Sequence, residues 1–107
     1  MKLLLAIVSN DDANSVIRAL YKEKFQTTKL ATTGGFLSKG NTTLITGCED
    51  DDVKRAIEII GNESKKRTEL VPSAAPFEAG ELLSAPIEVT VGGATIFVLD
   101  VDQFVKL

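Results

Sequence analysis

The sequence predicts a single α+β domain in which two helices cover one face of a sheet. Three observations predict it: a short, continuously apolar run near the start, two segments whose apolar residues recur every three or four positions, and Thr- or Val-rich runs typical of strands. The predicted order is strand, helix, strand, strand, helix, long loop and hairpin. A core of this order is the ferredoxin-like βαββαβ arrangement, and 107 residues suit one domain spanning residues 1–107.

The first predicted strand is the run "KLLLAIV" at residues 2–8. From Leu3 to Val8 it is continuously apolar, and it stops at "SNDD", a pattern typical of a buried central strand. Ser9, Asn10 and Asp11 suit the N-cap of a helix, because their side chains accept hydrogen bonds from free backbone N–H groups. The helix is predicted over residues 12–24, and its apolar face consists of Ala13, Val16, Ile17, Leu20 and Tyr21.

The middle of the chain predicts two strands and a second helix. The strands are residues 25–33 and 42–48, and "EDDD" at 49–52 is predicted to cap the helix, where carboxylates oppose the positive end of the dipole. A divalent-cation site is the less favoured alternative, since consecutive carboxylates on a helix start do not converge. The apolar stripe of the helix is Val53, Ala56, Ile57 and Ile60, and its stop signals are Gly61 and Asn62.

Residues 63–86 show no periodicity and contain all three prolines. They predict a long loop, which is uncommon inside a compact domain and is usually functional or disordered. Several loop residues are nevertheless apolar, and we expect them to pack against a ligand or another chain. These residues are Leu70, Val71, Phe77, Leu82 and Leu83.

The end of the chain predicts a hairpin, "IEVTV-GG-ATIFVL", with a tight turn at Gly92 and Gly93. Residues 96–99 are apolar on both faces and therefore predict a central strand. The sheet face opposite the helices would be bare in one subunit, so its apolar residues predict an oligomer. The residues expected to anchor the terminus are Val101, Phe104 and Val105.

The chemistry-bearing residues exclude several classes of function. A single cysteine, Cys48, cannot form an intramolecular disulfide, and the chain has no histidine, which excludes soft-metal sites and Ser–His or Cys–His catalytic pairs. Asp100 and Asp102 have no such partner. We therefore expect no enzyme, no metal and no cofactor.

Charge and hydropathy bear on partners and location. A net charge of −3, with one dense basic cluster at residues 65–67, argues against a nucleic-acid polymer as partner. The apolar run at the start ends at Val8, too short for a signal peptide or for a span of ~20 residues. We expect a cytoplasmic protein without a membrane span.

In residues 28–47, "TKLATTGGFLSKGNTTLITG", two strand-like runs flank a connection of about eight residues, whereas a hairpin needs only a two-residue turn. A solvated tip explains its glycines and asparagine but not the apolar pair Phe36 and Leu37. Glycines that let the backbone approach a phosphate, beside an aromatic ring that stacks on a base, would use both features. A phosphate-ligand loop is therefore an alternative to a solvated tip.

The segment 28–47, the start "MKLLLAIV" and the stretch "VTVGGATIFVLDVDQF" at 89–104 resemble the PII-like cyclic di-AMP receptor family over essentially the whole chain. The resemblance implies a homotrimer of ferredoxin-like subunits, with a cyclic di-AMP pocket at each subunit interface. It also implies a short loop at 33–41 and a long loop before the last strands.

Candidate ligand-binding residues follow from the resemblance. At matching positions the family contacts its ligand through Thr28, Gly35, Phe36, Leu37, Asn41, Gly47 and Phe97. Two further candidates depart from the family pattern. Gln26 stands where the family commonly has an arginine, so it offers an amide but no charge. Lys106 stands where a glutamine is frequent, and it can offset the negative charge of the ligand.

The function implied is a non-enzymatic signal-transduction sensor of cyclic di-AMP. One alternative is a PII-like sensor of another adenine nucleotide, reached through Gln26 and Lys106. A second alternative is a ligand-free trimeric protein-interaction module that uses Phe36 and Leu37. The sequence does not specify the downstream protein partner.

Overall fold

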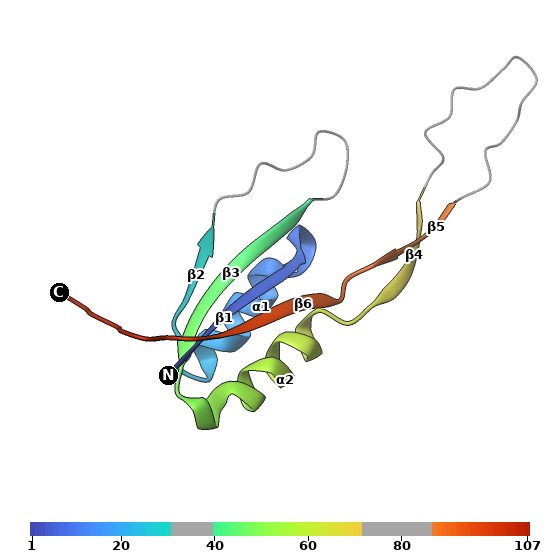
Figure 1. The fold of residues 1–107 in the computed structure, drawn as a ribbon. Helices are drawn as coiled ribbons and strands as arrows, with labels where there is room; N and C mark the ends of the chain where they lie inside the picture. The colour runs from blue at the N-terminus through green and yellow to red at the C-terminus, as the bar shows by residue number, and fades with distance from the viewer. Residues whose placement is uncertain (31–39, 72–86) are drawn as a thin grey trace, which may run out of the picture.

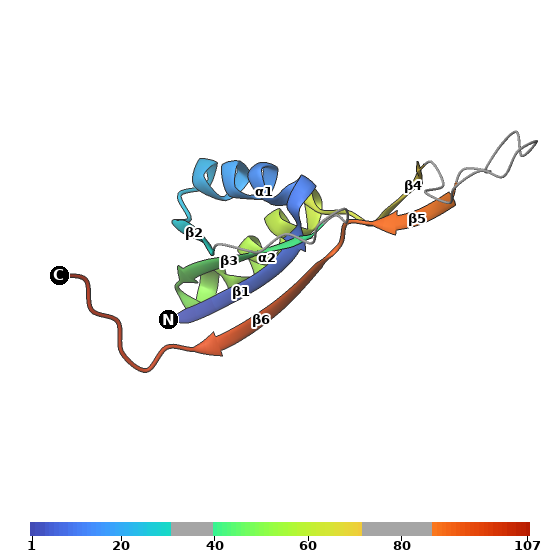
Figure 2. The same cartoon turned by 90° about the horizontal axis from the view of Figure 1, so that it is seen from above.

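The computed structural model describes residues 1–30, 40–71 and 87–107. It is a small α+β fold, in which two helices pack on one face of a four-stranded sheet (Figures 1 and 2). A two-stranded ribbon projects from one end of the sheet, and the C-terminal segment leaves from the opposite end. Among the described residues, no helix covers the second face of the sheet.

The sheet is centred on β1 (Lys2–Ser9), as the continuous apolar run predicts. The antiparallel neighbours of β1 are β3 (Asn41–Cys48) and β6 (Ala94–Asp100), while β2 (Thr27–Leu30) pairs with β3. The order β2-β3-β1-β6 is consistent with a ferredoxin-like core, so the predicted fold class agrees with the structure.

The pleat of β1 separates two sets of apolar side chains. Leu4, Ala6 and Val8 face the helices and are buried. The intervening Leu3, Leu5 and Ile7 are only half-buried, because they lie on the other side of the sheet. We call that side, which carries no helix, the open face.

Helix α1 (Asn10–Lys22) begins within the polar cluster, two residues before the predicted start at residue 12. The Ser9 hydroxyl oxygen accepts a hydrogen bond of 3.3 Å from the backbone N–H of Asp11, so Ser9 is the N-cap. The helix ends two residues earlier than predicted, and Lys24 follows with a φ of 67°. Tyr21, predicted on the apolar face, is 55% exposed and donates its hydroxyl hydrogen to the Thr27 carbonyl at 3.1 Å.

Helix α2 (Val53–Glu63) follows a 3₁₀ turn, η1 (Asp50–Asp52). The prediction that the carboxylates of "EDDD" cap this helix is wrong as far as side-chain hydrogen bonds are concerned: neither Glu49 nor Asp52 makes one at its cap position. The backbone makes the turn instead, since the Asp52 N–H donates to the Glu49 carbonyl at 2.9 Å.

The end of α2 also differs from the prediction. Gly61 and Asn62 lie inside the helix, which ends at Glu63. Ser64 then closes it, because its hydroxyl donates to the Ile60 carbonyl at 2.5 Å and its N–H donates to the Gly61 carbonyl at 3.3 Å. A side chain that satisfies the last carbonyls removes the need for glycine as the stop.

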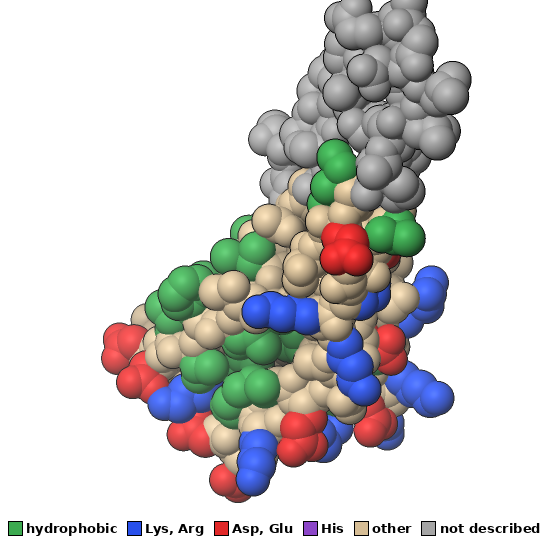
Figure 3. Space-filling model, turned by 90° about the vertical axis from the view of Figure 1, so that its right-hand side faces the viewer, with side chains coloured by type: hydrophobic (Ala, Val, Ile, Leu, Met, Phe, Trp, Pro, Cys, Tyr) green, Lys and Arg blue, Asp and Glu red, His purple; other side chains and the backbone are tan. Residues whose placement is uncertain are grey.

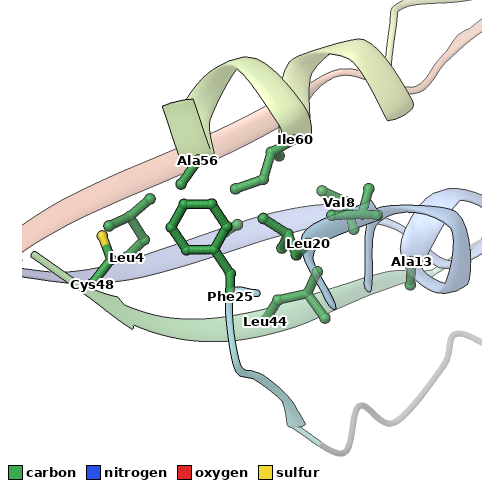
Figure 4. Close-up of a cluster of buried hydrophobic side chains, with 11 residues drawn as sticks. Leu4, Val8, Ala13, Leu20, Phe25, Leu44, Cys48, Ala56 and Ile60 are labelled. Atoms are coloured by element: carbon green, nitrogen blue, oxygen red, sulfur yellow. The ribbon is translucent and has the colours of Figure 1, made fainter. Parts of the chain in front are cut away.

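The core lies between the helices and the inner face of the sheet (Figure 4). Its apolar members are Leu4, Ala6, Val8, Ala13, Val16, Leu20, Phe25, Leu44, Cys48, Ala56 and Ile60. The Arg55 guanidinium lies 4.4 Å from the centre of the Phe25 ring and covers it. Burial raises the pKa of the Cys48 thiol, which therefore packs as a small apolar side chain.

The predicted loop at 63–86 and the predicted hairpin both need correction. Residues Arg67–Val71 form a strand, β4, which pairs with β5 (Ile87–Val91) in a separate ribbon. Since β6 pairs with β1, Gly92 and Gly93 connect two sheets and do not turn a hairpin. Both glycines have positive φ, 85° and 81°, as expected, but at a joint between the ribbon and the core.

Strand β6 is an edge strand of the sheet and not a central one. Its apolar residues face both ways because Ile96 packs against the core while Phe97 and Leu99 lie on the open face. Phe97 is 53% exposed and Leu99 43%. Phe104 and Val105, predicted anchors, are each 64% exposed and do not anchor the terminus in one subunit.

The joint predicts different costs for two matched substitutions. A side chain at either Gly92 or Gly93 is strained at positive φ, by about 1 kcal/mol or more. At Gly92 a Cβ would also collide with the Lys65 carbonyl and lie 2.7 Å from Arg67 Nη1, whereas at Gly93 it meets only the flexible Lys66 side chain. Denaturant unfolding and amide exchange of β4–β5 should show a clearly larger effect for Gly92→Ala. Equal effects would contradict this reading of the joint.

Candidate functional site

A hollow of about 340 Å³ lies on the open face at the end of the sheet from which the C-terminal segment departs. Three candidate residues, Gln26, Thr28 and Gly47, line it together. We call it the Gly47 hollow. Its other lining residues are Met1, Leu3, Ile45, Val101 and Phe104.

Strand register explains why these candidates meet. Thr28 pairs with Ile45 across β2 and β3, and Gly47 lies two residues further along β3, opposite Leu3 of β1. Side chains two apart on a strand point to the same face. Thr28 and Gly47 therefore both present to the open face, one with a hydroxyl and the other with bare backbone.

The neighbouring Thr27 points the other way. It is buried, and its hydroxyl shares a hydrogen bond of 2.9 Å with that of Thr46. Thr28 is exposed. Adjacent threonines thus serve opposite faces of the sheet, one in the core and one in the hollow.

Gly47 leaves room in the hollow. A Cβ built on it would lie 3.4 Å from the terminal carbon of Met1, so a larger side chain would occupy the space that glycine leaves open. The remaining walls are apolar apart from the Gln26 amide and the Thr28 hydroxyl. None of the described side chains that line the hollow carries a charge, so its chemistry suits a flat, uncharged group with a hydrogen-bonding edge.

Asn41, another candidate, lines a different hollow, of about 300 Å³, at the joint with the ribbon. Asn41 and Gly47 are at opposite ends of β3, about 20 Å apart at 3.3–3.4 Å per residue. We call the second site the joint hollow. Its other lining residues are Ile7, Ser9, Lys66, Gly92, Gly93, Ala94 and Thr95.

Phe97 lies in the same cross-strand row as Thr28 but on the far edge of the sheet. The row runs from Thr28 through Ile45 and Leu5 to Phe97. Three strand spacings separate its ends, about 14 Å. One subunit therefore does not bring the Phe97 ring to the Gly47 hollow.

Four candidates remain. Gly35, Phe36 and Leu37 lie outside the described residues, as do Phe77, Leu82 and Leu83 of the predicted loop. Lys106 is exposed in the C-terminal segment and is not among the lining residues of the two hollows. Within the described part of one chain, the candidates form one cluster of three and several separate positions.

Most lining residues of the two hollows were not predicted as site residues, and two of them, Phe104 and Lys66, bear on ligand binding. Phe104, expected only to anchor the terminus, forms a wall of the Gly47 hollow, and Lys66, assigned to a solvated basic cluster, lines the joint hollow. An apolar ring shortly after the last strand was the signal for Phe104. No local signal marks Lys66, because its position depends on the pairing of β4 with β5.

Asp100 and Asp52 have structural partners. Asp100 forms an ion pair with Lys2, and this contact raises the pKa of the Lys2 ammonium group. Asp52 pairs with Arg55 at 3.4 Å. Within residues 1–30, 40–71 and 87–107, no group of three or more His, Cys, Asp or Glu side chains is arranged to hold a metal ion. No helix in these ranges has the length and apolar character needed to cross a membrane.

The fold and its hollows define a small α+β protein whose concave sites suit a small ligand. The chain matches the cyclic-di-AMP receptor family over residues 1–107, its whole length, and it belongs to that family. The resemblance inferred from the sequence motifs is thereby confirmed. The family consists of binding and signalling proteins.

A solved structure is similar in both sequence and fold. It is the crystal structure of a functionally unknown protein from Pediococcus pentosaceus ATCC 25745, with 42% sequence identity and a TM-score of 0.74. The match covers 99% of this chain and 96% of that one. Because the function of that protein is unknown, the match supports the fold only. The ligand class has to be inferred from family membership and from the site.

Proposed function

We propose that this protein is a non-enzymatic sensor that binds cyclic di-AMP between the subunits of a homotrimer. Family membership supports the ligand class. The observation that carries the proposal is the Gly47 hollow, where Gln26, Thr28 and Gly47 meet on the open face. Binding there changes the shape that the sensor presents to a downstream protein.

The Gly47 hollow suits one adenine of the ligand. Apolar walls that include the Phe104 ring take the faces of the base, and a base–aromatic stack is worth ~1–3 kcal/mol. The Gln26 amide has both donors and an acceptor, which match the amino group and ring nitrogens of adenine. The Thr28 hydroxyl and the backbone at Gly47 complete the polar contacts.

The rest of the ligand needs a second subunit. A hollow of about 340 Å³ is at the small end of the ~300–1,000 Å³ range of ligand sites, and cyclic di-AMP carries two adenines and two phosphates. Asn41 and Phe97 are too far away within one chain. A neighbouring copy on the open face supplies them, together with Gly35, Phe36 and Leu37, and Lys106 offsets phosphate charge.

The open face supports such an assembly. In Figure 3 hydrophobic side chains gather along one flank, whereas basic and acidic side chains crowd the base and the opposite flank. Phe97, Leu99 and Phe104 are all at least 43% exposed in the single subunit. Apolar groups of this size in one region favour association.

Gln26 favours a second candidate ligand. Because Gln26 brings no cation to the Gly47 hollow, another adenine nucleotide could fill it as well as cyclic di-AMP does. ATP, AMP and linear dinucleotides are therefore the competitors to compare. A trimer that binds none of them would favour the interaction-module alternative.

Thr28 and Thr27 give a matched pair of substitutions. Thr28→Ala removes a hydroxyl from the hollow, so we expect the affinity for cyclic di-AMP to fall about fivefold (~1 kcal/mol), with thermal unfolding unchanged. Thr27→Ala removes a buried hydrogen bond, so we expect a loss of ~1–3 kcal/mol in the free energy of unfolding, with affinity unchanged. Calorimetric titration and denaturant unfolding measure both effects. If the two variants exchange roles, the assignment of faces is wrong.

Gly47→Val tests whether the hollow is the binding site. The valine side chain fills the hollow and suits a strand, so we expect cyclic di-AMP affinity to fall at least about tenfold while the unfolding midpoint stays close to wild type. Gly61→Ala is the control, because its Cβ contacts nothing within 4 Å. Titrations should include ATP and AMP. Unaltered binding by Gly47→Val would remove the hollow from the proposal.

Phe97→Asp tests the assembly. We expect light scattering of the wild-type protein to give three times the mass of the 11.5 kDa chain, and the variant to dissociate, because a carboxylate would be buried in the contact. Ile57→Asp, on the helix layer, is the control for an added charge at an exposed apolar site. A wild-type monomer at micromolar concentration would refute the trimer.

A further inference from the structure

A bidentate ion pair ties the β4–β5 ribbon to the core. Arg67, the first residue of β4, lies beside Asp12 in the first turn of α1, with Nη2 3.0 Å from Oδ1 and Nη1 3.3 Å from Oδ2. The guanidinium is held further by the Lys65 carbonyl at 3.1 Å and by Glu69 at 3.5 Å. Paired parallel bonds of this kind fix direction as well as distance.

The pair is sheltered on the side of the core. The Asp12 side chain is 9% exposed and that of Arg67 38%. The ribbon contributes nothing to the described apolar core, and Leu70 and Ile87 are 66% and 48% exposed. An isolated two-stranded ribbon is marginal in water. The stability of the β4–β5 ribbon therefore depends on its attachment to the core more than on packing within the ribbon.

The same turn of α1 also holds the start of β3. The Asn10 N–H donates to the Gly40 carbonyl at 3.0 Å, and the Thr42 hydroxyl donates to the Asn10 side-chain oxygen. Asn10 and Asp12 are two residues apart on one helical turn. That turn thus contacts the strand that carries Asn41 on one side and the base of the ribbon on the other.

The joint hollow lies on the open face beside the base of the ribbon, on the opposite side of the sheet from α1. Asn41 forms one part of its lining, while Lys66, Gly92 and Gly93 from the base of the ribbon form another. A ligand held by Asn41 in this hollow would therefore lie against the base of the ribbon. An occupant of the joint hollow would contact the base of the ribbon directly. The first turn of α1 would connect the occupant to the ribbon indirectly, because that turn contacts both β3 and Arg67.

We propose that Asp12 and Arg67 are positioning residues that set the direction of the β4–β5 ribbon. Through them, ligand binding at Asn41 restrains the motion of the ribbon. The second half of this inference rests on the proposed function. An occupant of the joint hollow, an anionic dinucleotide that Asn41 and Lys66 hold, restrains the ribbon base. The ion pair transmits that restraint because it fixes the ribbon to a turn that is itself bonded to β3.

Hydrogen–deuterium exchange of the ribbon amides tests the positioning role without ligand. For Arg67→Gln we expect exchange in β4 and β5 to rise at least about fivefold, with β1 unchanged. Asp12→Asn should do the same, and Arg67→Lys should give an intermediate rise because it keeps the charge and loses the fork. Arg18→Gln is the matched control. It removes an exposed arginine from α1, the helix that carries Asp12, and the described contact of that arginine is the Ser15 hydroxyl at 3.5 Å.

Two checks make the first result decisive. Thermal unfolding verifies that each variant keeps a folded core. Wild-type exchange in the ribbon of a folded Arg67→Gln protein would overturn the proposal. Faster exchange in Arg18→Gln as well would overturn it too, because the effect would then be one of net charge.

A second arm adds cyclic di-AMP. In wild-type protein we expect the ligand to slow ribbon exchange, and in Arg67→Gln we expect binding by calorimetry without that slowing. Equal slowing in both would overturn the transmission role. If the wild type binds no cyclic di-AMP, the proposed function and the transmission role fail together. The positioning role is then still decided by the ligand-free arm.

Discussion

The alternation of side chains along β1 is the constraint on which the structure depends. One strand supplies the floor of the core through Leu4, Ala6 and Val8, and the centre of the open face through the residues between them. Because both sets are apolar, both faces of the sheet disfavour contact with water, and the two helices of the described residues cover one of these faces. The Gly47 hollow, which we propose as the ligand site, lies on the uncovered face, next to the positions where β2 and β3 repeat the same alternation with threonine and glycine.

The sequence allowed the central features to be predicted because their causes are local. A continuous apolar run predicts β1, and Ser9 predicts the cap of α1, since both depend on neighbours in the chain. The pairing of β4 was not predictable in this way. Its strand is an exposed ribbon with charged residues, so it has no apolar period, and β5 finds its partner across a long segment. The same cause made the glycine pair look like a hairpin turn.

The candidate site likewise contains residues that the sequence predicted and residues that only long-range pairing reveals. Thr28 and Gly47 were found through motif resemblance, and the register of β2 with β3 accounts for their meeting. Phe104 was taken for an anchor, because nothing in the sequence says that the terminus passes beside the end of β3. Lys66 and Asp12 gained their interest from long-range pairing that no local pattern encodes.

The position of β6 at the edge of the sheet has a consequence for handling the protein. Its apolar run, Ile96 to Leu99, offers backbone donors and acceptors to any strand that approaches, which is the usual starting point of edge-to-edge aggregation. Charged or proline gatekeepers are absent within that run. Any partner that covers this edge therefore protects the chain from aggregation. Dilution or heating that removes the partner exposes the edge of β6, where aggregation can begin.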